Sequence, residues 1–183
     1  NVFRQRGTIA VVIRHIKAKI PAFEDLHLPE VIRDMSLTKR GLVLVTGTTG
    51  SGKSTTLAAM LDYINQNEAV NIITVEDPIE YLYRDDKAII SQREIGVDTL
   101  SYANALRAAL RQDPDVLLVG EIRDLETMQI ALTAADTGHM VFATIHTTNA
   151  TETIHRVLSM YPPHQHDEIR LLLSEVLAGI ISL

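Results

Sequence analysis

The sequence predicts an α/β domain in which helices flank a mainly parallel sheet. Short aliphatic runs of strand length recur from residue 42 onward, without the polar alternation of a half-exposed strand. Such runs are typical of parallel strands buried on both faces. Segments with helical spacing separate the runs, and strands that alternate with helices indicate a parallel sheet. A glycine-rich loop joins the first run to the first helix.

The composition is that of an ordinary globular protein, and it excludes several classes of function. The 183 residues are 46% hydrophobic and 22% charged, with a net charge of −6. The acidic balance leaves no basic stripe for phosphates, so we expect no nucleic-acid partner. The chain has no cysteine, which fits the cytosol and excludes thiolate metal sites. No apolar run reaches the roughly 18 residues of a transmembrane helix.

The chain divides near Lys39–Gly41, where the residue pattern changes. Residues 8–16 are apolar and β-branched, which predicts a strand. The segment that follows contains prolines and scattered charges. It predicts a linker with a short helix at Pro29–Met35, because proline suits a first helical turn.

The rest of the chain predicts strands and helices in alternation. The expected strands are 42–46, 71–75, 116–120 and 140–145, with a short edge strand at 88–91. The expected helices are 54–67, 101–111, 125–136 and 167–181. Ser101 and Asp124 suit helix N-caps, and Thr147–Asn149 suits the cap of a further helix.

The glycine-rich loop carries a phosphate-binding motif. GTTGSGKST matches the G-x-x-x-x-G-K-[ST] pattern between a predicted strand and a predicted helix. Its glycines let successive N–H groups face a phosphate, and the helix N-terminus adds donors. Lys53 is expected to reach the β- and γ-phosphates, and Ser54 to bind Mg²⁺. We therefore expect ATP and Mg²⁺ as ligands, held by Gly47, Thr48, Thr49, Gly50, Ser51, Gly52, Lys53, Ser54 and Thr55.

Four acids follow predicted strands at the edge where such a sheet binds its ligands. Glu76, Asp77 and Glu80 follow one strand, and Glu121 follows another. These side chains are candidates for metal and water chemistry. Asp115 precedes its strand and is expected at the far edge.

Glu121 comes one residue late, because Gly120 stands between it and the apolar run. A one-residue offset turns a side chain to the other face of a regular strand. A bend at Gly120, which glycine permits, would return Glu121 to the phosphate side.

Two histidines and one arginine complete the candidates. His139 and His146 bracket residues 140–145, and seven strand residues span about 23 Å, so only one can reach the γ-phosphate. His146 lies at the ligand edge; for His139, packing or a subunit contact explains its position better. Arg14 is a candidate for offsetting transition-state charge, with an exposed solvated arginine as the even alternative.

Longer stretches indicate a family. GLVLVTGTTGSGKSTTLAAMLDYIN, IITVEDPIEY, SQREIGVDT, ALRAALRQDPDVLLVGEIRDLET and TAADTGHMVFATIHTTNA follow one another. In this order they resemble the Walker A, acidic Asp box, connecting signature, Walker B and His box of type IV pilus retraction ATPases. These belong to the secretion-ATPase superfamily of hexameric P-loop motors.

The resemblance implies a RecA-like ATPase core and roles for particular residues. Glu80 is implied to be the catalytic glutamate, and Glu121 to help bind Mg²⁺. His139 and His146 are both implied to be functional, which places His139 with the nucleotide-binding residues. Arg14 matches a family arginine of the N-terminal domain that contacts the phosphates.

The resemblance also implies the domain organisation. Residues 1–20 correspond to the last strands of a truncated N-terminal α+β domain, 21–40 to the linker and 41–183 to the ATPase core. The family's C-terminal helical region is missing. The longer parent is implied to be a cytoplasmic homo-hexamer at the inner membrane that works with the platform protein of the pilus machine and powers retraction and twitching motility.

Other functions remain open. A pilus assembly or type II secretion ATPase has the same chemistry. Such relatives usually carry a tetracysteine zinc site, and this chain has no cysteine, which favours retraction. An accessory ring subunit with little turnover is disfavoured by the retained Lys53, Glu80 and Glu121. A nucleic-acid translocase is disfavoured because the chain has only 5 tyrosines, 3 phenylalanines and no tryptophan for base stacking.

Overall fold

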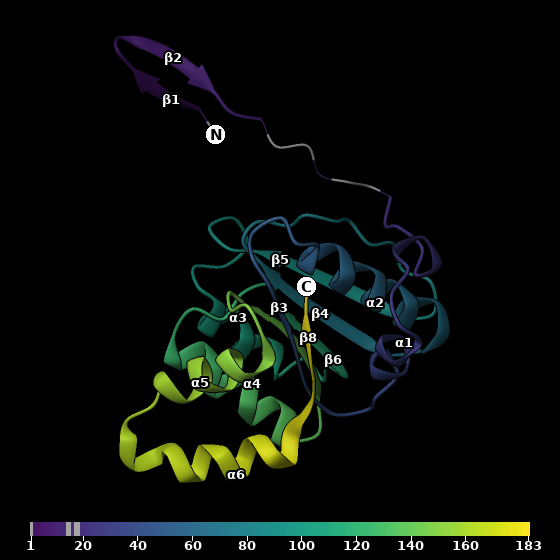
Figure 1. Ribbon diagram of the computed structural model, residues 1–183. Coiled ribbons are helices and arrows are strands. Elements are labelled where there is room, and N and C mark those ends of the chain that lie inside the picture. The colour runs from purple at the N-terminus through teal and green to yellow at the C-terminus, as the bar shows by residue number, and fades with distance from the viewer. Residues whose placement is uncertain (1, 14–15, 17–18) are drawn as a thin grey trace.

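The computed structural model describes residues 2–13, 16 and 19–183, and its main body is a sheet between two layers of helices (Figure 1). Among these residues, six strands form the sheet in the order β5-β4-β6-β7-β3-β8. Every neighbouring pair in it is parallel. The strands are β3 (Gly41–Thr46), β4 (Asn71–Glu76), β5 (Ile89–Glu94), β6 (Val116–Val119), β7 (Met140–Ile145) and β8 (Leu177–Ser182).

The central strands are buried along their whole length, as continuous aliphatic runs predict. Every residue of β3, β6 and β7 is buried. A cluster on one face packs against α1 (Glu30–Ser36) and α2 (Lys53–Asn67). A second cluster on the other face packs against α3 (Tyr102–Ala109), α4 (Leu125–Asp136), α5 (Ala150–Ser159) and α6 (His166–Val176). The predicted α/β fold is confirmed.

The predicted caps begin three of these helices. The Ser101 side chain accepts the Asn104 N–H at the start of α3. Asp124 accepts the Thr127 N–H at the start of α4. Asn149 begins α5 within the predicted Thr147–Asn149 stretch. Each side chain satisfies a backbone donor that would otherwise lack a partner in the first turn.

The prediction of one helix over 167–181 is wrong. Helix α6 ends at Val176, and residues 177–182 form β8, which pairs with β3 at the edge of the sheet. Gly179 accounts for part of this arrangement. A Cβ there would lie 2.8 Å from the Met35 Cε, so the strand passes under α1 where only glycine fits without displacing Met35.

The N-terminal residues form a separate two-stranded antiparallel sheet from β1 (Val2–Gln5) and β2 (Thr8–Val11). The strand predicted at 8–16 is therefore confirmed only over Thr8–Val11. Arg14 lies outside the described residues.

The segment predicted as a linker is packed onto the core. It contains a short 3₁₀ turn, Glu24–Leu26, and then α1. Phe23 and Ile32 are buried in the same cluster as α2. The Arg33 guanidinium lies over the rings of Phe23 and Tyr63, with its Cζ 5.3 and 5.4 Å from the ring centroids. The segment is thus fixed to the helix that begins at the phosphate loop.

Candidate nucleotide-binding site

A cavity of about 510 Å³ opens where the parallel strands end. That volume lies within the range of small-molecule sites, and the carboxyl edge of such a sheet is where ligands bind. Of the predicted residues, it is lined by Thr49, Gly50, Gly52, Lys53, Ser54, Thr55, Glu76, Asp77, Glu80, Glu121 and His146. Four segments of the chain, at 49–55, 76–80, 121 and 146, therefore meet in one cavity.

The phosphate loop needs glycine at defined positions. Gly47, Gly50 and Gly52 have φ angles of 142°, 82° and 109°, a region that other residues rarely adopt. A Cβ on Gly47 would also lie 2.5 Å from Ser51 Oγ and 2.6 Å from Leu183 O. The sequence therefore fixes a tight loop that exposes backbone N–H groups to an anion.

Lys53 is folded back over this loop. The side chain is 8% exposed, and Nζ donates to the carbonyl oxygens of Gly47 and Thr48, both at 2.9 Å. Burial lowers the pKa of Lys53, and the nearby charges of Glu121 and Glu80 offset part of that shift. An anionic phosphate would act in the same direction as these carboxylates, so the loop suits a bound polyphosphate.

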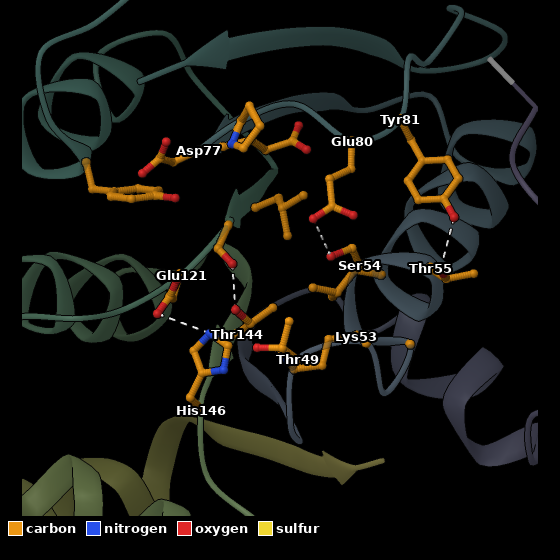
Figure 2. Close-up of a pocket in the computed structure, with 18 of the residues that line it drawn as sticks. Thr49, Lys53, Ser54, Thr55, Asp77, Glu80, Tyr81, Glu121, Thr144 and His146 are labelled. Atoms are coloured by element: carbon orange, nitrogen blue, oxygen red, sulfur yellow. Dashed lines mark hydrogen bonds and ion pairs between the residues drawn. The ribbon is translucent and has the colours of Figure 1, made fainter. Parts of the chain in front are cut away.

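The start of α2 contacts the segment that carries Glu80. Ser54 Oγ donates to Glu80 Oε1 at 3.1 Å, and Thr55 Oγ1 bonds with the Tyr81 hydroxyl at 2.9 Å. Figure 2 shows both pairs side by side at the cavity. Glu80 is therefore held one hydrogen bond away from the phosphate loop.

A second group of charges surrounds Glu121. Arg123 lies 2.6 Å from one carboxylate oxygen, and His146 Nε2 lies 3.2 Å from the other. Arg123 also lies 3.6 Å from Asp77. Burial raises the pKa of Glu121, but the hydrogen bond and charge of Arg123, with those of His146, outweigh it and give a net lowering. Glu121 is thus kept as a carboxylate.

The backbone at Gly120 explains why Glu121 comes one residue late. The Gly120 N–H donates to Val75 on β4, whereas the Ile122 N–H donates to Thr144 on β7. In a regular strand, residues two apart direct their N–H groups to the same neighbour. The chain therefore slips by one residue between them, and Glu121 enters the cavity. The predicted bend at Gly120 is confirmed.

Thr144 holds this slip in place. Its Oγ1 donates to Gly120 O at 2.6 Å, and its own carbonyl accepts the Ile122 N–H at 3.0 Å. A side chain at Gly120 would be crowded, because a Cβ would lie 3.0 Å from the Tyr102 hydroxyl and 3.1 Å from Glu76 Cα. Thr144 was not among the residues predicted from the sequence, although its place inside the His box was a usable signal.

The residues suit a magnesium ion that is held mostly by its nucleotide. Within residues 2–13, 16 and 19–183, no group of three histidines, cysteines or acids can hold a metal by itself. Mg²⁺ commonly uses one or two protein oxygens, with phosphates and waters as its other ligands. The Ser54 hydroxyl and the Glu121 carboxylate both line the cavity and could supply such oxygens.

Of the predicted site residues that the structure describes, four do not line the cavity: His139, and Gly47, Thr48 and Ser51 of the phosphate loop. His139 precedes β7 at the opposite edge of the sheet, as predicted, where Nδ1 lies 2.9 Å from Ala134 O. Asp115 is also at that edge and accepts the Asn71 N–H at 2.8 Å. Ser51 is in the phosphate loop but does not line the cavity.

Comparison of the sequence with known proteins identifies a family and similar relatives. A family model described as type II/IV secretion system protein matches residues 10–182. The type IV pilus retraction ATPase PilT of Pseudomonas aeruginosa is 52% identical over 182 residues, which are 100% of this chain and 53% of the relative. A twitching motility protein of Neisseria gonorrhoeae is 50% identical over 182 residues, 100% of this chain and 49% of the relative.

A solved structure has the same fold. The crystal structure of the pilus retraction motor PilT with bound ADP matches with a TM-score of 0.96 and 55% identity. It covers 98% of this chain and 52% of that chain. The chain therefore spans about half the length of the relatives it matches.

In the part of the chain that the structure describes, no helix is long and apolar enough to cross a membrane. By sequence, fold and motif order, the chain belongs to the type II/IV secretion system protein family.

Proposed function

We propose that the protein containing this chain hydrolyses ATP with Mg²⁺ and uses the energy to retract type IV pili. The observation that carries the proposal is the meeting of the phosphate loop, Glu80 and Glu121 in one cavity. The names of the relatives similar over the whole of this chain support the pilus system. The ADP in the similar structure supports an adenine nucleotide.

The residues divide the chemistry of phosphoryl transfer. The loop N–H groups and Lys53 bind the phosphates, and Ser54 and Glu121 hold Mg²⁺, which neutralises charge on the phosphate oxygens. Glu80 orients the attacking water and accepts its proton. His146 contacts Glu121 and senses whether the γ-phosphate is present.

Further parts of the proposal rest on the family resemblance. Arg14 offsets charge at the phosphates. His139 is carried over from the family as a functional residue, without a contact to the nucleotide in this cavity, because it lies at the opposite edge of the sheet. The full-length protein forms a homo-hexamer in the cytoplasm, at the inner membrane, where the platform protein of the pilus machine is its partner. Pilus assembly or type II secretion is the second candidate, because its chemistry is the same.

Glu80→Gln tests the catalytic assignment. Glutamine keeps the oxygen that accepts from Ser54 but is no base, so we expect kcat for ATP to fall by about 10²- to 10⁴-fold. Nucleotide affinity, measured with a fluorescent ATP analogue, should stay close to that of the parent. Hydrolysis at the parental rate in a variant that still assembles would contradict the assignment. A loss of nucleotide binding alone would instead make Glu80 a structural residue.

The direction of force needs a cellular readout. Twitching and fibre retraction should be lost when Glu80→Gln replaces the parental gene, while surface pili persist. Loss of pili from the surface would favour the assembly candidate.

A further inference from the structure

The connecting signature SQREIGVDT has no assigned role in the chemistry above, yet its side chains reach the segment that carries Glu80. This segment runs from Asp77 to Ala88, between β4 and β5, and has neither helix nor regular strand. A chain without its own ladder of hydrogen bonds depends on neighbouring groups for its conformation. The side chains that fix it therefore also fix Glu80.

Two side chains of β5 bond to the backbone on either side of Glu80. Glu94 Oε2 accepts the N–H of Ile79, the residue before Glu80, at 3.0 Å. Gln92 Nε2 donates to the carbonyl of Tyr81, the residue after it, at 2.9 Å. Gln92 and Glu94 are two residues apart on a strand, so their side chains share one face. We call this pair the β5 bracket.

Gln92 is itself held by several partners. Its Oε1 accepts the Tyr83 N–H at 3.0 Å, and its Nε2 also donates to Glu76 Oε1 at 3.2 Å. The backbone of β5 pairs in parallel with β4 along the whole strand. The bracket thus fixes the backbone of the irregular segment relative to the regular sheet.

We propose that Gln92 and Glu94 are positioning residues that hold the Glu80 carboxylate against Ser54 and the phosphate loop. This inference rests on the proposed catalytic role of Glu80. A displacement of about 1 Å in a catalytic group costs on the order of a hundredfold in rate. Bonds at residues 79 and 81 hold the backbone on both sides of Glu80 and so restrict the displacement of its carboxylate.

Glu94 offers a test with a conservative rescue. In the full-length protein, Glu94→Ala removes the acceptor of the Ile79 N–H, and we expect kcat to fall by on the order of tenfold or more with KM for ATP little changed. Glu94→Gln keeps an oxygen that accepts this N–H, and it should restore most of the rate. A glutamine variant as slow as the alanine variant would overturn the hydrogen-bond account.

Asp85→Ala is the matched control. Asp85 Oδ1 accepts the Ile90 N–H at 3.1 Å, so it also links the segment to β5 by a side-chain oxygen and a backbone N–H, but not at a residue adjacent to Glu80. We expect its kcat and KM to equal those of the parent. An equal loss in Asp85→Ala and Glu94→Ala would show a general loosening of the segment and overturn the proposal.

A double-mutant cycle ties the effect to Glu80. If the bracket acts through Glu80, then Glu94→Ala has no further effect on kcat once Glu80→Gln is present, because interacting sites are not additive. Additive losses would overturn the proposal. A slow Glu80→Gln with a fully active Glu94→Ala would reject the bracket alone, whereas a fully active Glu80→Gln would reject the catalytic assignment first.

Gln92→Met provides a second variant in case Glu94→Ala does not fold. Methionine is close to glutamine in size but has no amide, so the bonds to Tyr81, Tyr83 and Glu76 are lost. We expect the same fall in kcat at unchanged KM, in protein whose melting temperature shows that it is folded. A parental rate in this variant would count against the bracket.

Discussion

At the scale of single residues, Glu76 is an acid placed where its charge is unfavourable. It is 8% exposed, and its Oε1 accepts from the Thr74 hydroxyl at 2.6 Å. Burial raises the pKa of Glu76, and the hydrogen bonds from Thr74 and Gln92 offset part of the rise. For an acid whose pKa is raised by folding, the stability contribution is present below the unfolded pKa and is lost as pH rises through the folded pKa.

The raised pKa of Glu76 predicts how Glu76→Gln changes the free energy of unfolding with pH. The amide keeps an oxygen for Thr74 but carries no charge, so the variant should gain stability relative to the parent as pH rises from about 4. Urea denaturation between pH 4 and 8 would measure the difference in free energy of unfolding. Glu175→Gln, at an exposed position, is the control and should follow the parent. If the Glu76→Gln and parental profiles run parallel, Glu76 does not have a raised pKa.

At the scale of elements, the ends of β6 and β7 act as one unit. The Thr144 hydroxyl and carbonyl hold residues 120 and 122, and Glu121 projects from between them. Its side chain then meets Arg123 and His146, which come from the same two strand ends. The geometry of Glu121 thus depends on the hydroxyl of a residue in the neighbouring strand.

Thr144→Val tests this dependence at nearly constant shape. The variant leaves Gly120 O without its partner, and we expect about 1–3 kcal/mol less stability. We expect kcat to fall by about tenfold or more, because Glu121 loses its fixed position. Thr144→Ser keeps the hydroxyl and should retain most of the activity. Thermal denaturation and steady-state ATPase assays measure the two effects; an active Thr144→Val would show that Glu121 is positioned without the hydroxyl.

At the scale of the whole molecule, the segment before the core is part of the packed body. Helix α1 packs against α2, and Ile32 is 5% exposed while its neighbour Val31 is 53% exposed. Helix α2 begins at Lys53 in the phosphate loop. A displacement of the loop by nucleotide therefore acts on a helix to which the preceding segment is attached.

Ile32→Ala distinguishes a packed segment from a free linker. We expect a loss of about 2–5 kcal/mol, because the variant leaves a cavity in the cluster around α2. Val31→Ala should change the free energy of unfolding by no more than about 0.5 kcal/mol, as exposed substitutions do. Equal and small effects of the two variants in urea denaturation would mean that α1 does not stay on the core in solution.

One wrong prediction, the helix over 167–181, and two missed residues, Thr144 and Gln92, have one physical cause. Residues 177–181 were predicted as the end of a helix, and a short apolar run does not distinguish strand from buried helix. Their strand depends on pairing with β3, more than 130 residues earlier in the chain. Thr144 and Gln92 were likewise missed because their partners, Gly120 and Tyr81, belong to other segments, 24 and 11 residues away.

The sequence by itself determined the alternation of strands and helices, the phosphate loop and the edge of the sheet at which its acids lie. These features depend on local spacing and on the rule that parallel strands end together. Only the tertiary structure decided that β8 closes the sheet, that Thr144 turns Glu121 into the cavity and that β5 brackets Glu80. Each of these depends on hydrogen bonds between different segments of the chain, which a pattern along one segment does not contain.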